Sequence, residues 1–566
     1  MLKTYTWPRY VSRHTTPLGG RVPLVVVGAG PVGLAAAIDA GQRGMTVLLL
    51  DEDDTVSIGS RGLCWAKRTL EIFDRLGLGD AVVAKGVTWN VGRTYHGERE
   101  VFSFDLLPEA GHARPGMVNL QQYHLEQMLV ERAEALPSID LRWRHKVVGV
   151  VHHDDGITLE IETPEGRSTL HADWLIAADG ARSMLRRLLG LDTSGQVFHD
   201  RFLIADVLLD AEPYPADRTE RRFWFEPSFH GRHSVLMHRQ ADQVWRIDFQ
   251  LDRDADPEVE KDPVRVAPRI RALLDQQGLA HIGFELEWLS VYTFQCRRMA
   301  RFRHGRVCFV GDAAHQVSPF GARGANSGVQ DIDNLVWKID LVQRGLAPQA
   351  LLDSYDHERG QAADENLLAS ARSTDFMSPK SHAARVLRNA VLGLAAEWPM
   401  GRALVDSGRL SVPALLQASP WLTPDADSGW QGWMQAGAPL DDAPVSTAGV
   451  SGWLLRATGH GFVLLHFGVA DAAAAAVLHG LSLGALPLRP LLVLAADEAE
   501  ATLRGLPAVV DSAGLAARRC DTRPGSVVLL RPDQHVAARW RTLDAAAVRA
   551  ALARACGHTA ATETAA

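Results

Sequence analysis

A glycine-rich turn near the N-terminus constrains the fold more than any other feature of the sequence. The turn reads Gly28-Ala29-Gly30-Pro31-Val32-Gly33 and satisfies the pattern G-x-G-x-x-G. It follows a strand-like apolar run, Leu24–Val27, and opens an alanine-rich helical segment, Leu34–Arg43. A second strand-like run, Thr46–Leu50, comes next. This β-α-β order predicts a parallel sheet that is covered by helices.

The same turn predicts a dinucleotide site. Gly28 permits the tight turn, Gly30 lets the backbone approach a pyrophosphate, and Gly33 allows the helix to pack closely on the strand. The free N–H groups and the positive end of the helix dipole attract the phosphates. Asp51 ends the next strand, where a carboxylate can accept hydrogen bonds from a ribose. The pattern alone does not separate FAD from NAD, but residues 459–464 fail to complete a second copy, which argues against a reductase with two dinucleotide domains.

Composition and charge narrow the setting. The net charge of −8 at pH 7 gives no reason to expect a nucleic acid or an anionic membrane as partner. The five cysteines are scattered and none belongs to a C-x-x-C pair, so we expect neither a disulfide framework nor a metal site. No uncharged stretch approaches the roughly 20 residues that a membrane helix needs, and residues 1–20 lack the apolar core of a signal peptide. We therefore expect a soluble, cytoplasmic protein.

The rest of the chain predicts a mixed α/β and α+β architecture. Short alternating runs such as Ser234–Gln240 and Val244–Leu251 indicate an antiparallel sheet. Pro, Gly, Asp and Ser gather in a later stretch that is typical of a linker, and a small α/β domain follows it. We expect a Rossmann-like dinucleotide domain in two parts, 20–195 and 301–418, an inserted sheet over 196–300, a linker over 419–449 and a C-terminal domain over 450–558.

A second motif places a carboxylate at the end of a strand. It reads Trp174-Leu-Ile-Ala-Ala-Asp179-Gly180-Ala-Arg182-Ser183. Asp179 either organises the neighbouring arginines or simply caps the helix that begins near Ser183.

The third motif indicates a flavin. It reads Gly311-Asp312-Ala-Ala-His315 and then Pro319-Phe-Gly321-Ala-Arg-Gly324-Ala325-Asn326. Asp312 can accept hydrogen bonds from a polyol such as the ribityl chain, and Gly321 and Gly324 let the backbone approach a flat ring. The helix that opens near Asn326 would stabilise an anionic ring edge. We expect His315 to be structural rather than catalytic.

Together the three motifs resemble those of the group A flavoprotein aromatic hydroxylases, which share the fold of para-hydroxybenzoate hydroxylase. The resemblance covers roughly residues 22–400 and includes an arginine-bearing segment from Ser60 to Gly77. It is greatest for the branch of 3-(3-hydroxyphenyl)propionate, pentachlorophenol and polyketide hydroxylases. The last domain is similar to the thioredoxin-like tail of some of these enzymes, but it lacks the redox C-x-x-C, so we expect a structural role for it.

By position, the resemblance implies roles for individual residues. It assigns cofactor contacts to Arg61, Gln122, Asp179, Arg182, Asp312, Gly324, Ala325 and Asn326, with Asp179 and Arg182 linked to both FAD and NAD(P)H. Two departures from the family pattern stand out. Asp51 replaces the commoner Glu, and Arg323 stands in the glycine loop with an undefined role.

Substrate contacts are expected from the antiparallel sheet. Along residues 244–250, strand alternation puts Arg246 and Asp248 on one face and the apolar residues on the other. Arg246 lies where relatives present an arginine to the flavin, and His238 comes from the neighbouring strand. For His238 and Asp248, the polar side of a half-buried sheet is an equally good interpretation.

The resemblance implies a single-component monooxygenase that binds FAD, takes NADPH or NADH and O2 as co-substrates, and hydroxylates a phenolic aromatic compound. It also allows a homodimer. Two alternatives stay open at this point. One is an enzyme of the same fold that acts on a polyketide or an antibiotic, and the other is a catalytically silent FAD-binding interaction protein.

Overall fold

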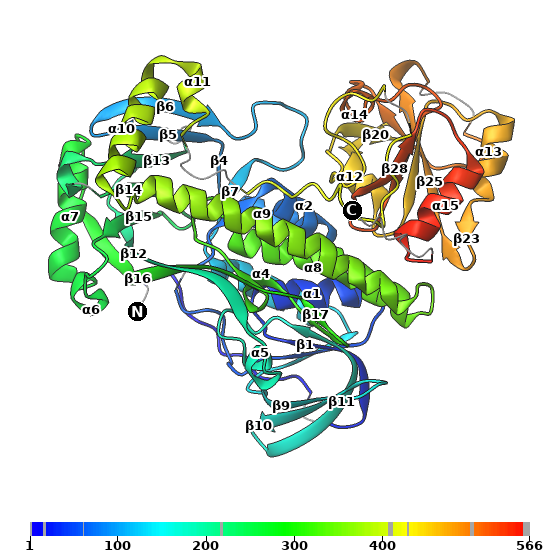
Figure 1. The fold of residues 1–566 in the computed structure, drawn as a ribbon, viewed down its shortest axis with the longest axis horizontal. Coiled ribbons are helices and arrows are strands. Elements are labelled where there is room, and N and C mark those ends of the chain that lie inside the picture. The colour runs from blue at the N-terminus through cyan, green and yellow to red at the C-terminus, as the bar shows by residue number, and fades with distance from the viewer. Residues whose placement is uncertain are drawn as a thin grey trace.

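The computed structural model describes residues 3–14, 18–59, 61–215, 219–231, 233–405, 411–426, 429–498 and 503–558. Ser60 and residues 427–428 of the predicted linker lie outside these ranges. The described chain forms three large sheets, each packed against helices (Figure 1). None of its helices is long and apolar enough to cross a membrane. All five cysteines are free thiols.

The first sheet is the Rossmann-like layer. Its parallel strands run in the order β18 (Val307–Phe309), β11 (Gly166–Ala177), β1 (Arg21–Val27), β2 (Val47–Leu50) and β8 (Ile139–Arg142). The antiparallel strands β9 (Lys146–His152), β10 (Ile157–Thr163) and β17 (Arg303–His304) extend it. Every residue of β2 is buried, as expected for a parallel strand that is covered on both faces. The helices α1 (Pro31–Gln42), α4 (Gln122–Glu134) and α8 (Gly324–Gln343) pack beside one another along this sheet.

The second sheet is mostly antiparallel. Its strands run in the order β19 (His315–Gln316), β16 (Phe284–Met299), β12 (Thr193–Leu209), β15 (Val244–Leu251), β14 (Val235–Arg239), β13 (Glu220–Phe225), β5 (Val91–His96) and β6 (Arg99–Asp105). The strands β5 and β6 come from the range that we assigned to the first part of the dinucleotide domain. They join this sheet through β5 and β13, which pair in parallel although they are far apart in the sequence.

One face of the second sheet is a hydrophobic core. Trp245, Ile247 and Phe249 of β15 are buried there with residues of α7 (Pro263–Gln276). This confirms the alternation that was predicted for β15, and it leaves Arg246 and Asp248 on the opposite face.

A small three-stranded sheet and helix α2 connect the two layers. The strands β3 (Cys64–Ala66) and β4 (Val87–Trp89) both pair with β7 (Met117–Asn119). Helix α2 (Lys67–Arg75) follows β3 directly and packs against α8, and α3 (Gly79–Lys85) follows α2.

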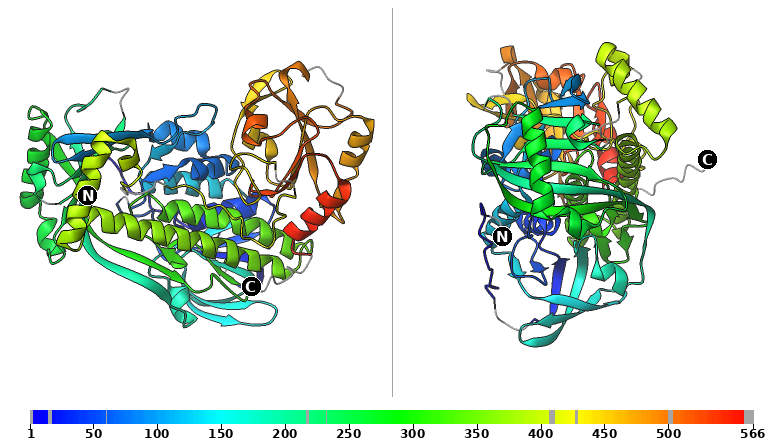
Figure 2. Two further views of the ribbon diagram at one scale, coloured as in Figure 1. Left: turned by 45° about the horizontal axis from the view of Figure 1, so that its top comes forward. Right: turned by 90° about the vertical axis from the view of Figure 1, so that its left-hand side faces the viewer.

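Long helices dominate the next part of the chain. Helix α9 (Asp353–Met377) packs along α8, and α10 (His382–Glu397) contacts β6 at the far end of the second sheet (Figures 1 and 2). The last helix of this part is α11 (Pro399–Arg402), well before residue 418, where we placed the end of the dinucleotide domain. Residues 411–416, with Pro413 among them, have no regular secondary structure.

The C-terminal unit is a third α/β layer, consistent with the predicted thioredoxin-like domain. Its sheet runs in the order β21 (Val450–Trp453), β20 (Pro444–Thr447), β26 (Ala508–Asp511), β25 (Arg489–Ala495), β22 (Val463–Phe467), β27 (Val527–Leu530) and β28 (Val536–Trp540). Its helices are α12 (Leu454–Thr458), α13 (Ala472–His479), α14 (Leu515–Arg519) and α15 (Ala545–Ala555). The strand β20 falls inside the predicted linker.

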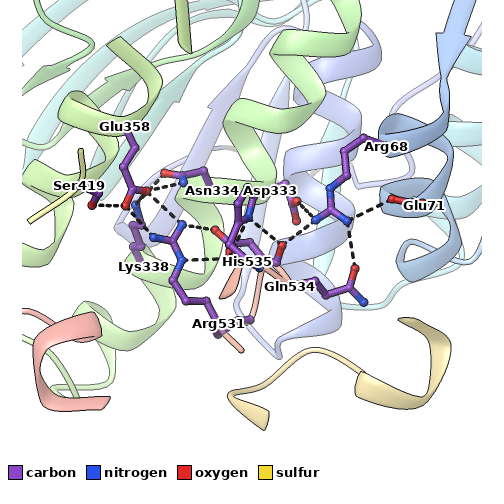
Figure 3. A network of polar contacts seen from close by, with 12 residues as sticks. Arg68, Glu71, Asp333, Asn334, Lys338, Glu358, Ser419, Arg531, Gln534 and His535 are labelled. Carbon is purple, nitrogen blue, oxygen red and sulfur yellow. Dashed lines mark hydrogen bonds and ion pairs between the residues drawn. The ribbon is translucent and has the colours of Figure 1, made fainter. Parts of the chain in front are cut away.

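A buried polar network joins the C-terminal unit to α8, α9 and α2 (Figure 3). The guanidinium of Arg531 donates to both carboxylate oxygens of Glu358 at 2.6 and 3.0 Å. Lys338 of α8 donates to the same carboxylate at 3.0 Å. On the other side of the network, Arg68 of α2 donates to the backbone oxygen of Asp533 at 2.6 Å. These contacts fix the C-terminal unit against α8, which begins at the glycine loop, and against α2 and α9.

Candidate active site

The turn between β1 and α1 has the shape of a pyrophosphate cradle. Gly28 has a φ of +106°, and a Cβ there would lie 2.4 Å from the backbone oxygen of Ala178. A Cβ on Gly33 would lie 1.8 Å from the backbone oxygen of Gly28. Packing within the protein therefore requires these two glycines. A Cβ on Gly30, the N-cap of α1, would meet nothing within 4 Å. Gly30 thus borders open space in front of a helix N-terminus, where a pyrophosphate fits.

Asp51 lies at the edge of this cradle, directly after β2. Its carboxylate accepts hydrogen bonds from the backbone N–H groups of Ala29 and Asp53. Burial raises the pKa of Asp51 to about 6, against the effect of these two hydrogen bonds. Asp51 is thereby fixed to the glycine turn, in the position from which a carboxylate reaches a ribose.

The arginine-bearing segment is held by Gln122. The backbone N–H of Gly62 donates to Oε1 of Gln122 at 2.8 Å, and Nε2 of Gln122 donates to Ser57 and Glu126. Arg61 itself is exposed, and its charge opposes the raised pKa of the Asp312 carboxyl. Gln122 therefore positions the segment, and Arg61 lies on the same side of the site as Asp312.

The structure gives Asp179 a local role and leaves one of its oxygens free for another. Its Oδ2 accepts from the backbone N–H of Leu185 in α5 (Met184–Leu188), so the capping interpretation holds for this oxygen. Its Oδ1 is buried with no hydrogen-bond partner among the described residues, and burial raises the pKa of the carboxyl. Arg182 is exposed.

A buried ionic cluster holds the Gly311-Asp312 turn. Asp331 of α8 accepts from the backbone N–H of Gly311 at 2.9 Å, from His315 at 2.6 Å and from Arg359 at 2.7 Å. Against the effect of burial, His315 and Arg359 lower the pKa of Asp331. His315 is thus a structural hydrogen-bonding residue, as expected. Asp312, at the start of this turn, is exposed, and its carboxyl can accept hydrogen bonds from a ligand.

The start of α8 is locked to β3. Asn326 accepts from the backbone N–H of Ala66 at 2.9 Å and donates to the backbone oxygens of Cys64 and Ala322. Ala322 has a φ of +55°, a conformation that a residue with a side chain adopts only when its surroundings enforce it. Helix α8 begins at Gly324, and a Cβ on Gly62 would lie 3.7 Å from Ala325. The predicted residues of this loop and of the arginine segment therefore come together.

Arg323 points away from this loop. Its side chain is buried and donates to Asn366 of α9 at 3.2 Å.

The glycine loop packs on the polar side of the second sheet. Phe320 lies 5.2 Å from Phe202 of β12 and 5.3 Å from Phe294 of β16, measured between ring centroids. Ala322 packs in a cluster with Cys64 and Trp89. The loop therefore meets the sheet through packed aromatic rings, which exclude water from this contact.

Arg246 and His238 both lie on this side, in different environments. Arg246 is buried and donates to both carboxylate oxygens of Asp206, each at 2.8 Å. Against the effect of burial, Asp206 raises its pKa. Nδ1 of His238 lies 3.3 Å from Nδ2 of Asn119, while Nε2 is buried with no partner among the described residues. Burial, with Arg221 and Arg246, lowers the pKa of His238 well below its usual value, so the ring is neutral.

Asp248 and two residues that sequence reasoning missed complete the polar side. Burial raises the pKa of Asp248 to about 7, and its Oδ1 has no partner within the described parts of the chain. Nε of Arg221 on β13 and the hydroxyl of Tyr292 on β16 also have no hydrogen-bond partner among the described residues. Burial raises the pKa of Tyr292 to about 12. An arginine in an alternating strand is an ordinary sequence feature, so no sequence signal singles out Arg221.

Comparison with known proteins agrees with this geometry. A family model described as an FAD binding domain matches residues 21–370, and one described as the HcaD C-terminal domain matches residues 445–555. A 3-(3-hydroxy-phenyl)propionate/3-hydroxycinnamic acid hydroxylase of Mycolicibacterium smegmatis is 28% identical over 384 residues, which are 67% of this chain and 66% of that protein. The match thus spans just under two thirds of that relative.

Two further proteins are similar. The para-nitrophenol 4-monooxygenase of a Pseudomonas strain is 30% identical over 340 residues, which are 59% of this chain and 82% of that protein. The solved structure of the flavin-dependent monooxygenase PieE, in complex with FAD and substrate, superposes with a TM-score of 0.77, over 95% of this chain and 100% of that one, at 24% identity. The structural likeness shows a shared fold.

The first family model covers more than half of the chain, and the open space at Gly30 in front of the N-terminus of α1 fits the cofactor that the model names. The chain therefore belongs to the FAD binding domain family, and it is an FAD-dependent monooxygenase.

Proposed function

We propose that the protein hydroxylates a phenolic aromatic compound in the space between the second sheet and the loop at Gly321–Gly324. The observation that supports this most is the pair of unpartnered polar atoms on the sheet, Oδ1 of Asp248 and Nε2 of His238. One is a hydrogen-bond acceptor and the other a donor, and a phenolic hydroxyl is both. The named relatives act on hydroxyphenyl and nitrophenol compounds, which is the same class.

Asn119 determines the tautomer of His238, and thereby makes its Nε2 a hydrogen-bond donor. The indole N–H of Trp89 donates to Oδ1 of Asn119 at 2.8 Å, which fixes the orientation of the amide. Nδ2 of Asn119 donates to the backbone oxygen of Arg239 and faces Nδ1 of His238. Because an amide nitrogen only donates, Nδ1 accepts, and the neutral ring carries its proton on Nε2. His238 therefore offers an N–H to a phenolic oxygen.

Asp248 is the acceptor of the phenolic proton. The register pairs Leu236 with Asp248 and His238 with Arg246, so His238 and Asp248 are diagonal neighbours on one face, about 7–8 Å apart at the backbone. A hydroxyl between them donates to Oδ1 of Asp248 and accepts from Nε2 of His238. Sharing or loss of that proton makes the ring richer in electrons at its ortho and para carbons. A carboxyl with a pKa near 7 is suited to this task at neutral pH.

FAD, when bound, supplies the redox chemistry that transfers one atom of O2 to the ring, with electrons from NADPH or NADH. Arg246 keeps Asp206 neutralised beneath the site, while the buried rings of Phe202, Phe294 and Phe320 keep water out. We further infer that O2 is the oxidant, that the protein acts in the cytoplasm and that it can form a homodimer. The division of the chain into a dinucleotide part, an inserted substrate part and a C-terminal part is also our proposal.

The test uses purified protein loaded with FAD. NADH and NADPH oxidation is followed across a panel of phenols, with polyketide substrates included, and products are identified by mass. We expect at least one phenol to stimulate oxidation and to gain one oxygen atom. Absence of stimulated oxidation across the panel, with the cofactor bound, would refute phenol hydroxylation, and turnover of the polyketides alone would favour the alternative substrate class.

A further inference from the structure

Arg221, on the polar side of the second sheet, is a cation with no carboxylate partner among the residues that the structure describes. Its Nε is buried and makes no hydrogen bond, and the guanidinium forms no ion pair with any residue that the structure describes. Burial lowers the pKa of Arg221, and the electrostatic effects of Cys64 and Asp248 oppose this shift. A charge in such surroundings is unfavourable unless something pairs with it.

The other buried arginines show that this is unusual for the chain. Arg323 donates to the amide oxygen of Asn366. The others in the described parts of the chain pair with carboxylates, namely Arg68, Arg114, Arg142, Arg246, Arg359, Arg388, Arg531 and Arg539. Arg222, the next residue along β13, points to the opposite face, where it lies 3.5 Å from the ring centroid of Tyr214 and donates to Gln277. Nε of Arg222 also lacks a partner, but its guanidinium forms an ion pair with Glu220 at 3.5 Å. The missing carboxylate partner therefore belongs to the Arg221 position and not to the strand.

Aromatic rings border the Arg221 guanidinium. It lies 5.9 Å from the ring centroid of Trp89, which belongs to the same cluster as Phe104 and Ala322 of the glycine loop. Gly92 of β5, opposite Arg221 in the register, leaves room for Phe104, since a Cβ there would lie 2.2 Å from its ring. The surroundings thus combine one cation with flat apolar walls, and they adjoin the loop at the flavin.

Asp248 is near but does not fill this role. It lies on β15 and Arg221 on β13, with β14 and its His238 between them. Neighbouring strands are about 4.8 Å apart, so the two backbones are about 10 Å apart. Both side chains keep a polar atom without a partner among the described residues, so each can still bind a ligand group.

We propose that Arg221 binds an anionic substituent of the aromatic substrate, of the carboxylate class, while the phenolic hydroxyl lies at Asp248 and His238. The planar guanidinium offers two parallel N–H groups that match a carboxylate. The Trp89 and Phe104 rings pack against the apolar part of the ligand. This inference rests on the proposed function for the position of the ring, but anion binding at Arg221 does not depend on turnover.

The experiment compares each acid with its neutral amide. The probes are 3-(3-hydroxyphenyl)propionate, 3-hydroxyphenylacetate and 3-hydroxybenzoate, each beside the matching primary amide. Binding to the FAD-loaded protein is measured by calorimetry, and kcat/KM is measured where turnover occurs. We expect the wild-type protein to prefer at least one acid over its amide. In Arg221→Gln that acid should lose about 30-fold or more in affinity, as removal of one partner of a buried charge pair implies, whereas the amide should change less than about threefold.

Arg222→Gln is the matched control, because it removes the same group from the other face of the same strand. It should keep the wild-type preference. Arg221→Lys should restore part of it, since the charge remains without the planar geometry. Equal affinity of the wild-type protein for acid and amide, or equal losses for both in Arg221→Gln, would overturn the assignment of Arg221. If no probe is hydroxylated but the acids bind through Arg221, the proposed reaction fails and the anion site stands.

Discussion

Asp248 is the residue whose charge state we expect to set the pH dependence of the reaction. Burial raises its pKa to about 7, with Arg246 and Arg221 opposing the rise and Asp206 adding to it. The ionised form accepts the phenolic proton, so kcat/KM should rise through about pH 7 and level off above it. In Asp248→Asn that rise should disappear and product formation should fall about 10²–10⁴-fold. A pH profile with the same rise in the variant would assign the acceptor elsewhere.

The raised pKa of Asp248 also makes the free energy of unfolding depend on pH. Its pKa in the folded protein lies above the ordinary value of 3.8, so folding favours the protonated form. The stabilisation is fully present below about pH 4 and is lost as the pH rises through about 7. Over that range the wild-type protein should lose unfolding free energy relative to Asp248→Asn, which has no charge to bury. Urea unfolding of both proteins at several pH values measures this, and a difference that stays constant with pH would contradict it.

Residue types and alternation were enough to name His238, Arg246 and Asp248 as a polar face, but not to separate their roles. The bond between Arg246 and Asp206 joins β15 to β12, and no local pattern reveals such a pairing. Arg221 was not predicted because what distinguishes it is the lack of a partner among the described residues, which only the folded structure shows.

At the scale of elements, two glycines of the β1–turn–α1 unit serve different purposes, since Gly33 is required for packing and Gly30 borders the expected ligand. Gly30→Ala adds a methyl group to open space at a φ of −74°, which any residue can adopt. The free energy of unfolding of the apoprotein should therefore stay within about 0.5 kcal/mol of the wild-type value. The same methyl group occupies the pyrophosphate position, and the flavin content after purification should therefore fall sharply. Gly33→Ala is the contrasting variant, because its Cβ would collide with the backbone of Gly28, and it should lose stability even without FAD. A Gly30→Ala protein that retains full flavin would show that the cofactor phosphates lie elsewhere.

Elements with strong local patterns were predicted closely, and those that depend on distant pairing were not. The strand at 244–251 has the predicted bounds, because alternation defines it locally, and β2 begins only one residue after the predicted apolar run at 46–50. The strands at 91–105 pair with a strand more than a hundred residues later, and the sequence near them carries no trace of that partner. The motifs of the candidate site were found because glycine turns and strand-end carboxylates are local features.

At the scale of the whole molecule, the C-terminal unit is built into the flavin domain rather than attached to it. Trp337 and Leu351 share a hydrophobic core with Phe462 and Leu552 of the C-terminal unit. The same helix that contributes Trp337 begins at the glycine loop, and α2 begins directly after β3 at the site. Loss of contacts at this interface should therefore loosen α8 and α2 and weaken cofactor binding at the site where both helices begin.

Arg531 provides the test of this coupling. It is buried between Glu358 and Asp533, and Glu358 has a lowered pKa because Arg531 and Lys338 outweigh the effect of burial. Arg531→Met removes the cation and leaves buried carboxylates, so the unfolding free energy should fall by about 3–5 kcal/mol. Flavin should dissociate at lower urea than in the wild-type protein, because α8 loses its anchor. Arg549→Met, an exposed position on α15, should stay within about 0.5 kcal/mol of wild type. Equal stability and equal flavin retention in the two variants would mean that the C-terminal unit does not support the cofactor site.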